Sequence, residues 1–289
     1  MTTNYKKIAF QGALGAYSDL ACRTVFPDLE TLPCHTFDDA FTALQSGTVD
    51  LAMIPVDNTI AGRVADVHHL LPESGLYIIG EHFQPIEHNL LGAKGTKIKD
   101  LKHVHSHVHA IPQCRKLIKK LGLNAHVHAD TAGAAEEVSR LKDPEHGAIA
   151  SSLAAKIYDL DILEENIQDE HHNTTRFLIL STEPQIPKID EKDKTITSLT
   201  FEVRNIPAAL YKSLGGFATN GLSMVKLESY VDEHFQAAQF YCDIEGHPES
   251  AAFKRAIEEL GFYAEDVKFL GSYPAHKFRT LYTKRSDEI

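Results

Sequence analysis

The chain has 289 residues, of which 43% are hydrophobic and 24% are charged, as is ordinary for a globular protein. Its 29 basic and 40 acidic residues give a formal net charge of −11, which excludes nucleic acid as an expected partner because phosphate binding needs a basic surface. The four cysteines show no paired spacing and predict reduced thiols rather than a disulfide framework or a zinc site.

The start of the chain does not resemble a targeting signal. Its apolar run, residues 8–10, is too short for a signal peptide, and no other stretch approaches the length of a membrane span. We therefore expect a cytoplasmic protein that makes no membrane contact.

Short strands and helices alternate over the first 160 residues. Asp39 follows Thr36 by three positions, which is typical of a capping box and predicts a helix from residue 37. The alternation favours an open α/β architecture with largely parallel sheets. The expected strands are residues 7–10, 50–55, 77–82, 103–106, 124–127 and 147–150. One helix is expected to begin at residue 19, and others are expected over residues 37–44, 110–121, 132–140 and 153–160.

The pattern changes after residues 181–194, which carry two prolines and seven charges and predict a linker. The strands expected beyond it are residues 197–203, 222–230, 235–245 and 267–272, and the helices are residues 208–219 and 249–260. This βαββαβ order is typical of the ferredoxin-like arrangement. We expect a first domain over residues 5–182, a linker over 183–195 and a second domain over 196–276.

The most informative segment is residues 172–177, His-Asn-Thr-Thr-Arg-Phe, which runs into an apolar stretch that suits a buried strand. Arg176 offers a fork of donors that grips a carboxylate bidentately, and Thr174 and Thr175 offer hydroxyls. This combination favours a small, oxygen-rich anion as ligand. The alternative is a structural ion pair, which is the commoner role of an arginine at a strand end.

Three loops share one design, in which a strand end passes through small or polar residues into a helix. They are residues 12–18, 57–62 and 106–113. Such turns expose backbone N–H groups that suit carboxylates, and in open α/β sheets they converge at the carboxyl ends of the strands. The alternative is that each loop only caps its own helix. Gly12 and Gly15 lack the third glycine and the downstream acid of a dinucleotide fingerprint, so no nicotinamide cofactor is expected.

Histidines alternate along two of the expected strands. A strand would place one set on one face, where zinc could bind. A helix beginning near His109 would break this spacing, and no His-Glu-x-x-His pair is present, so we expect no metal and leave the role of the histidines open. The residues concerned are His103, His105, His107, His109, His126 and His128.

Five segments, in this order along the chain, together resemble the prephenate dehydratase family with a C-terminal ACT regulatory domain. The most specific is residues 173–177, Asn-Thr-Thr-Arg-Phe, which stands where the family carries its Thr-Arg-Phe signature. Residues 55–62 resemble Pro-Ile-Glu-Asn-Ser-x-x-Gly, with Asp57 for Glu and Thr59 for Ser.

The other three segments are looser. Residues 106–114 resemble Ser-His-Pro-Gln-Ala and a following Gln-Cys, with Val108 and His109 in place of Pro-Gln. Residues 12–18 resemble Gly-Pro-x-Gly-Thr-Phe-Ser, and residues 130–135 match another family segment.

The resemblance implies a two-lobed dehydratase domain like the periplasmic binding-protein fold, with substrate between the lobes. It also implies a carbon–oxygen lyase that converts prephenate to phenylpyruvate, water and carbon dioxide in phenylalanine biosynthesis. Aromatisation supplies the driving force, so no cofactor is expected. On this basis Thr175 would donate to the leaving hydroxyl, Arg176 would anchor a carboxylate and Phe177 would form the floor. Substrate would be oriented by Asn58, Ser106, Gln113, Asn173 and Thr174.

Two alternatives remain open. An arogenate dehydratase would differ only in accepting the amino-acid analogue of prephenate. A non-catalytic two-lobed binding protein would hold a small molecule without producing phenylpyruvate.

The resemblance further implies a homodimer or homotetramer, with phenylalanine as an allosteric effector bound at the ACT domain. The family's Gly-Ala-Leu motif reads Ala208-Ala209-Leu210 here, after Asn205 and Pro207. A methyl group in place of the glycine could crowd the effector's carboxylate. The family's Glu-Ser-Arg-Pro motif keeps only Glu228 and Ser229. The alternative is a purely structural dimerisation domain.

Overall fold

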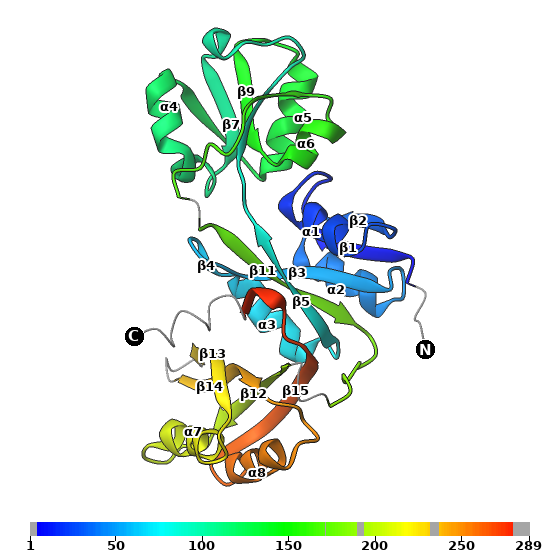
Figure 1. Ribbon diagram of the computed structural model, residues 1–289, viewed down its shortest axis with the longest axis vertical. Coiled ribbons are helices and arrows are strands. Elements are labelled where there is room, and N and C mark those ends of the chain that lie inside the picture. Colours follow the sequence, from blue (N-terminus) through cyan, green and yellow to red (C-terminus); the bar gives the residue numbers. More distant parts are fainter. Residues whose placement is uncertain (1–4, 171, 190–193, 232–236, 280–289) are drawn as a thin grey trace. The chain divides into compact units, whose positions relative to one another are not determined.

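The computed structural model describes residues 5–170, 172–189, 194–231 and 237–279 (Figure 1). The chain divides into two compact units. The first comprises Met1–Val67 and His82–Phe177, and the second comprises His68–Glu81 and Leu178–Ile289.

The first unit begins with a buried parallel core. Strand β1 pairs in parallel with β2 and with β3, and its central residues Ile8, Ala9 and Phe10 are fully buried. The strand order in this sheet is β2-β1-β3-β11-β5, with β4 paired to β3. The elements of this sheet and the helices beside it in the sequence are β1 (Lys7–Gln11), α1 (Tyr17–Val25), β2 (Glu30–Cys34), α2 (Phe37–Gln45), β3 (Leu51–Asn58), β4 (Gly62–Arg63), α3 (Ala65–Glu73), β5 (Tyr77–Pro85) and β11 (Thr174–Ser181), and of these the residues 68–81 and 178–181 belong to the second unit.

The capping box predicted at Thr36 is confirmed. The Thr36 hydroxyl accepts a hydrogen bond from the Asp39 N–H at 3.0 Å, and the Asp39 carboxylate accepts one from the Thr36 N–H at 3.1 Å. These two bonds satisfy orphan N–H groups at the start of α2.

A second sheet in this unit has the order β10-β6-β9-β7-β8. Strand β7 is parallel to β8 and β9, whereas β6 is antiparallel to β9 and β10, so the sheet is mixed rather than largely parallel. Its two faces bury separate apolar clusters, one around Val104 and Ile149 and one around Ala148 and Val138. The elements are β6 (Asn89–Gly92), β7 (His103–His107), α4 (Arg115–Leu121), β8 (Asn124–His128), α5 (Thr131–Leu141), β9 (His146–Ala150), α6 (Ser152–Ile157) and β10 (Asp161–Glu164).

The single helix expected over residues 110–121 is wrong. A 3-10 helix spans Ile111–Cys114 and α4 begins at Arg115. Pro112 has no N–H to donate and restricts the residue before it, which favours a short, tight turn ahead of the α-helix. A second 3-10 helix, Ile98–Asp100, was not predicted.

The second unit contains the expected βαββαβ order. Its strands form an antiparallel sheet with the order β13-β14-β12-β15, which is the ferredoxin-like arrangement. Phe201, Phe217 and Phe253 pack together in its apolar core. The elements are β12 (Thr195–Val203), α7 (Ala209–Thr219), β13 (Ser223–Val231), β14 (Ala237–Glu245), α8 (Ala251–Leu260) and β15 (Ala264–Pro274).

Residues 182–189 contain no helix or strand, whereas residues 190–193 of the expected linker lie outside the described part of the chain. The start of the strand expected at 235–245 also lies outside it, at residues 235 and 236. No helix within the described ranges is long and apolar enough to span a membrane.

Candidate functional site

A pocket of about 280 Å³ gathers polar side chains from widely separated segments of the first unit. Thr175 and Asn58, from the two motifs singled out in the sequence, both face it. The pocket is lined by Tyr17, Ser18, Pro55, Asn58, Ala61, Val64, Ile86, His88, His107, His109, Ala110, Gln113, Thr131, Asn173, Thr175 and Phe177.

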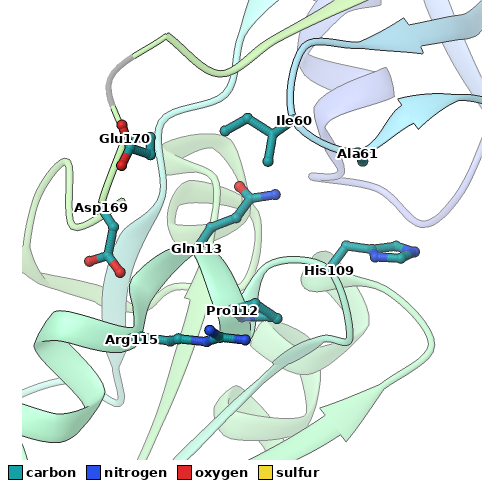
Figure 2. Close-up of a pocket in the computed structure, with 8 residues that line it drawn as sticks. All are labelled: Ile60, Ala61, His109, Pro112, Gln113, Arg115, Asp169 and Glu170. Atoms are coloured by element: carbon teal, nitrogen blue, oxygen red, sulfur yellow. The ribbon is translucent and has the colours of Figure 1, made fainter.

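A neighbouring pocket of about 380 Å³ shares Ala61, His109 and Gln113 with the first. Figure 2 shows Gln113 between the acidic pair Asp169 and Glu170 on one side and His109 on the other. Ile60, Pro112 and Arg115 complete its lining. Gln113 therefore belongs to both cavities and links them.

Asn58 is held by the turn that follows β3. Its side-chain oxygen Oδ1 accepts hydrogen bonds from the backbone N–H groups of Ile60 at 2.9 Å and Ala61 at 2.8 Å. Such an Asx turn is a common use of asparagine where a strand gives way to a loop. The two bonds fix the side-chain amide, so that Nδ2 faces the pocket.

A continuous hydrogen-bonded network joins the pocket's polar residues. Asn58 Nδ2 lies 2.8 Å from Thr175 Oγ1 and 2.8 Å from Asn173 Oδ1. Asn173 Nδ2 lies 2.6 Å from Gln113 Oε1, and His88 Nε2 lies 3.0 Å from the same oxygen. The structure therefore brings together Asn58, Gln113, Asn173 and Thr175, all four of which were expected at the site.

Alternation along β11 separates the Thr-Arg-Phe residues onto two faces. Thr175 and Phe177 line the pocket, and Phe177 is almost fully buried. Arg176 lies between them in the sequence, and its guanidinium is 3.8 Å from the Asp57 carboxylate. This geometry favours the ion-pair alternative, and the expectation that Arg176 anchors a carboxylate directly stays a prediction.

Ser106 and Thr174 were expected to orient substrate, but neither is among the residues that line the two pockets described here. Ser106 is fully buried, and its hydroxyl donates to the Ile149 carbonyl oxygen at 2.7 Å. The backbone N–H of Thr174 donates to Thr59 Oγ1 at 2.9 Å, and its carbonyl accepts from the Thr59 N–H at 3.0 Å. Thr174 thus ties the loop after β3 to β11.

The sequence pattern missed several lining residues, above all His88. Tyr17 Oη lies 2.8 Å from His88 Nδ1, so the network extends from Thr175 to α1. Tyr17 belongs to the loop expected at residues 12–18, and Thr131 begins the family segment at 130–135, so both carried a signal. His88 follows β5 in a stretch with no expected element, and nothing in the sequence pointed to it.

Burial keeps the inner wall of this pocket uncharged. It raises the pKa of Tyr17 well above its ordinary value, with smaller contributions from Cys114 and Glu87. Burial also lowers the pKa of His88 to about 4, although the hydrogen bond with Gln113 opposes this shift. Both side chains are therefore neutral near neutral pH.

Two helix N-termini face the same pocket, through Ser18 of α1 and Thr131 of α5. Ala16, the N-cap of α1, has no polar side chain, so it makes no hydrogen bond to the first N–H groups of that helix. Helix N-termini favour carboxylates through these N–H groups and the helix dipole. At α5, however, the Asp130 carboxylate caps the helix and accepts from the Gly133 N–H at 2.7 Å, so of these two helices α1 is the one that offers an anion N–H groups without a side-chain cap.

The histidines of the second sheet form a separate cluster. His105 Nδ1 lies 2.9 Å from His128 Nε2, His105 Nε2 lies 2.8 Å from His146 Nδ1, and His103 Nδ1 lies 3.0 Å from His126 Nε2. The imidazoles thus pair with one another. Within the described ranges, no group of three or more histidine, cysteine, aspartate or glutamate side chains is arranged to hold a metal ion.

The residues expected to bind an effector lie in the second unit. Ala208 is the N-cap of α7 and adopts a left-handed conformation with φ of 59°, as the glycine of the family motif would permit. Ala209 is buried, whereas Asn205 and Pro207 are exposed. Leu210 packs against the apolar core. Glu228 lies on β13 beside Ser229 and pairs with Lys226 at 3.1 Å.

Comparison with known proteins gives one consistent result. The family model described as prephenate dehydratase matches residues 8–185. A bifunctional N-acyl-homoserine lactone acylase/prephenate dehydratase from Komagataeibacter europaeus is 50% identical over 274 residues, covering 94% of this chain and 97% of the relative. Arogenate dehydratase/prephenate dehydratase 1 from Arabidopsis thaliana is 39% identical, covering 93% of this chain and 72% of the relative. The crystal structure of prephenate dehydratase in complex with L-Phe from Arthrobacter aurescens has a TM-score of 0.84 at 25% identity, covering 97% of this chain and 98% of that one.

Proposed function

Because the chain belongs to the prephenate dehydratase family, we propose that it converts prephenate to phenylpyruvate, water and carbon dioxide in the biosynthesis of L-phenylalanine. In this reaction the ring carboxylate leaves as carbon dioxide and its bonding electrons enter the ring. The C–O bond to the ring hydroxyl breaks, and the departing hydroxide takes up a proton to become water. The enzyme is a carbon–oxygen lyase.

One observation carries this proposal, namely that the Thr175 hydroxyl faces the pocket and is held by Asn58 at 2.8 Å. A positioned donor at the leaving hydroxyl stabilises the charge that develops as the C–O bond breaks. Asn58, Gln113 and Asn173 orient the substrate, and Phe177 forms the apolar floor. The N-terminus of α1, which has no side-chain cap, favours one of the two carboxylates.

Arg176 has two candidate roles that one variant separates. If it binds a carboxylate directly, Arg176→Lys raises KM sharply, because an ammonium cannot reproduce the bidentate fork. If its partner is Asp57, the same variant lowers the melting temperature and leaves KM unchanged. The 3.8 Å approach to Asp57 supports the second role.

The proposed reaction requires no cofactor, because formation of an aromatic ring supplies its driving force. Turnover should persist after treatment with a chelator. A loss of turnover that zinc restores would instead assign a function to the histidine cluster.

The second unit is proposed to be an ACT regulatory domain, with phenylalanine as an allosteric effector bound near Asn205, Ala208 and Glu228. Its βαββαβ order and antiparallel sheet support this assignment. A regulatory role requires phenylalanine to prefer one of two states, so binding and inhibition should appear together. We also propose that the chain forms a homodimer or homotetramer and is located in the cytoplasm. The first domain would end at residue 182, and the second would begin at residue 196.

Two relatives carry names that add substrates to be tested. Arogenate is the first, since the Arabidopsis relative is named for both dehydrations. An N-acyl-homoserine lactone is the second, since the relative that is 50% identical is named a bifunctional acylase. Val64, Ile86 and Phe177 give the pocket an apolar side that an acyl chain could contact.

A direct comparison of the three substrates tests the proposal. Phenylpyruvate formed from prephenate is followed by its absorbance, phenylalanine formed from arogenate by chromatography, and homoserine lactone by its released amine. We expect turnover of prephenate, and its loss in Thr175→Ala. Absence of phenylpyruvate with a folded wild-type protein would overturn the proposed function.

A further inference from the structure

The second cavity, next to the pocket that Thr175 lines, carries charges of both signs. Its volume is about 380 Å³, and its lining includes the basic residue Arg115 and the acidic residues Asp169 and Glu170. Figure 2 shows these three side chains around Gln113. One guanidinium and two carboxylates are complementary to a zwitterion, in which a carboxylate and an ammonium group lie close together, as they do in an α-amino acid.

Asp169 is held in place by the turn that carries Gln113 and Arg115. Its N–H donates to the Gln113 carbonyl oxygen at 2.6 Å, and its two carboxylate oxygens lie 3.2 and 3.3 Å from the Lys116 backbone nitrogen. Lys116 Nζ donates to the Asp169 carbonyl oxygen at 3.4 Å. An ionised carboxylate has about four lone-pair sites, so the bond from the Lys116 N–H leaves most of its capacity open to a ligand.

Arg115 offers the opposite charge at the same cavity. Within the described residues no hydrogen bond or ion pair engages its guanidinium, whereas that of Arg176 lies 3.8 Å from the Asp57 carboxylate. A guanidinium grips a carboxylate through two parallel hydrogen bonds. The fork of Arg115 is therefore open to a carboxylate of the ligand.

The lining of the two cavities matches the two ends of the substrate. The ring carries the leaving hydroxyl at one end, and it carries the ring carboxylate and the side chain at the opposite end. Thr175 lines only the first cavity, Arg115 and Asp169 line only the second, and Gln113 lines both. A substrate whose hydroxyl contacts Thr175 can thus extend its side chain past Gln113 towards Arg115 and Asp169.

We propose that the second cavity is a subsite for an α-amino acid group, in which Arg115 binds the side-chain carboxylate and Asp169 binds the ammonium. The inference rests on the proposed function, because it concerns the side chain of the same substrate. Arogenate and prephenate share this carboxylate, but arogenate has an ammonium where prephenate has a ketone. A carboxylate attracts the ammonium and offers no hydrogen to the ketone oxygen. Glu170 contributes less than the half-buried Asp169, because water screens its exposed charge.

Steady-state kinetics of the full-length protein with arogenate and with prephenate test this subsite. Asp169→Asn removes the charge but keeps an oxygen that accepts from the Lys116 N–H. The kcat/KM for arogenate should fall about tenfold, as for the loss of a charge-assisted hydrogen bond. The kcat/KM for prephenate should rise, because one negative charge fewer faces its carboxylate. Arg115→Gln should raise KM about tenfold for both substrates, because both lose the bidentate partner of the same carboxylate.

A matched control is Asp28→Asn, which removes an exposed carboxylate of the same unit that lines neither cavity. It should keep both wild-type values of kcat/KM. Glu170→Gln should lower the arogenate-to-prephenate ratio of kcat/KM by a smaller factor, and it decides the matter if Asp169→Asn fails to fold. Turnover of prephenate with the same ratio in wild type and in these acidic-residue variants would overturn the inference alone. A folded wild type that turns over neither substrate would overturn the proposed function, and the inference with it.

Discussion

Asn58 Nδ2 and Thr175 Oγ1 lie 2.8 Å apart, although the two residues are separated by 117 positions in the sequence. Strand order explains the contact, since β3 and β11 are neighbours in the first sheet. Both residues sit where their strands adjoin the pocket, Asn58 at the end of β3 and Thr175 near the start of β11. A motif near residue 58 and a motif near residue 175 therefore form one site.

Replacing Thr175 should affect chemistry more than folding. Thr175→Ala removes the hydroxyl that faces the pocket, and losing one preorganised donor lowers kcat by about a hundredfold or more. The matched control is Thr174→Ala, because the Thr174 contacts that tie the loop to β11 are made by its backbone. Rate assays with prephenate and thermal melts would show a large kcat loss for Thr175→Ala alone. Equal rates for wild type and Thr175→Ala would remove Thr175 from the mechanism.

Stability should fall in mild acid because of the histidine cluster. His105 faces His128, His126 and His146, and Glu137 of α5 is the acidic group near it. Burial, followed by repulsion from these imidazoles, lowers the pKa of His105 from 6.5 to about 4, while Glu137 opposes the shift. The unfolded chain therefore binds this proton at a higher pH than the folded chain does. The contribution of His105 to the free energy of unfolding is therefore fully present above pH 6.5, and it is lost as the pH falls towards about 4.

Urea unfolding midpoints measured from about pH 8 to about pH 4.5 would reveal this slope. His105→Phe removes the titrating group and should flatten the profile. His35→Phe changes an exposed histidine of the same unit and should keep the wild-type slope. Parallel profiles for wild type and His105→Phe would show that the cluster does not control acid stability.

The parts of the fold that could be predicted are those with a strong local pattern. The βαββαβ order and the capping box at Thr36 follow from periodicity and spacing, and both are present. Strand β6 was missed because it has four residues, and β2 because it carries Pro33 and has no strand-like alternation. Such strands are defined by the neighbours with which they pair, and pairing is not visible in a local window.

The site could be predicted only where motifs marked it. Asn58, Gln113, Asn173 and Thr175 lie in segments with unusual polar residues, and the structure brings them together. His88 lies in no such segment, and its role depends on packing beside residue 113 and residue 17. Arg176 and Thr175 are neighbours on β11 and therefore lie on opposite faces of the strand. The sequence does not specify which of the two faces the pocket.

A buried ion network in the second unit should be essential for its stability. The Arg279 guanidinium contacts the fully buried Glu81 carboxylate at 2.6 and 2.8 Å, and lies 3.7 Å from the buried Asp243 carboxylate. Arg279→Leu would leave both carboxylates without this cation, which costs about 3 kcal/mol of unfolding free energy.

Chemical denaturation would measure that loss. Adding Glu81→Gln to Arg279→Leu should recover part of it, because one buried negative charge is then removed. As a surface control, Arg255→Leu changes an exposed arginine that donates to Asn220 and should have little effect. An Arg279→Leu protein as stable as wild type would show that the network contributes nothing net.

Ala208 offers a test of how the effector site departs from the family pattern. Its φ of 59° is in the left-handed region, where a β-carbon costs about 1 kcal/mol and glycine does not. Ala208→Gly should therefore raise the unfolding free energy by about 1 kcal/mol and also remove the methyl group that could crowd an effector carboxylate. Phenylalanine should bind this variant more tightly than the wild type.

The neighbouring substitution separates backbone strain from a general effect of glycine. Ala209 begins α7 with no left-handed conformation, so Ala209→Gly relieves no strain and should destabilise the protein, because a buried methyl group is lost and the unfolded chain gains freedom. Melting curves would compare the two variants, and calorimetry with a rate assay would follow phenylalanine binding and inhibition together. If Ala208→Gly is stabilised yet shows no heat and no inhibition at millimolar phenylalanine, the second unit is a structural domain and the missing glycine is not the reason.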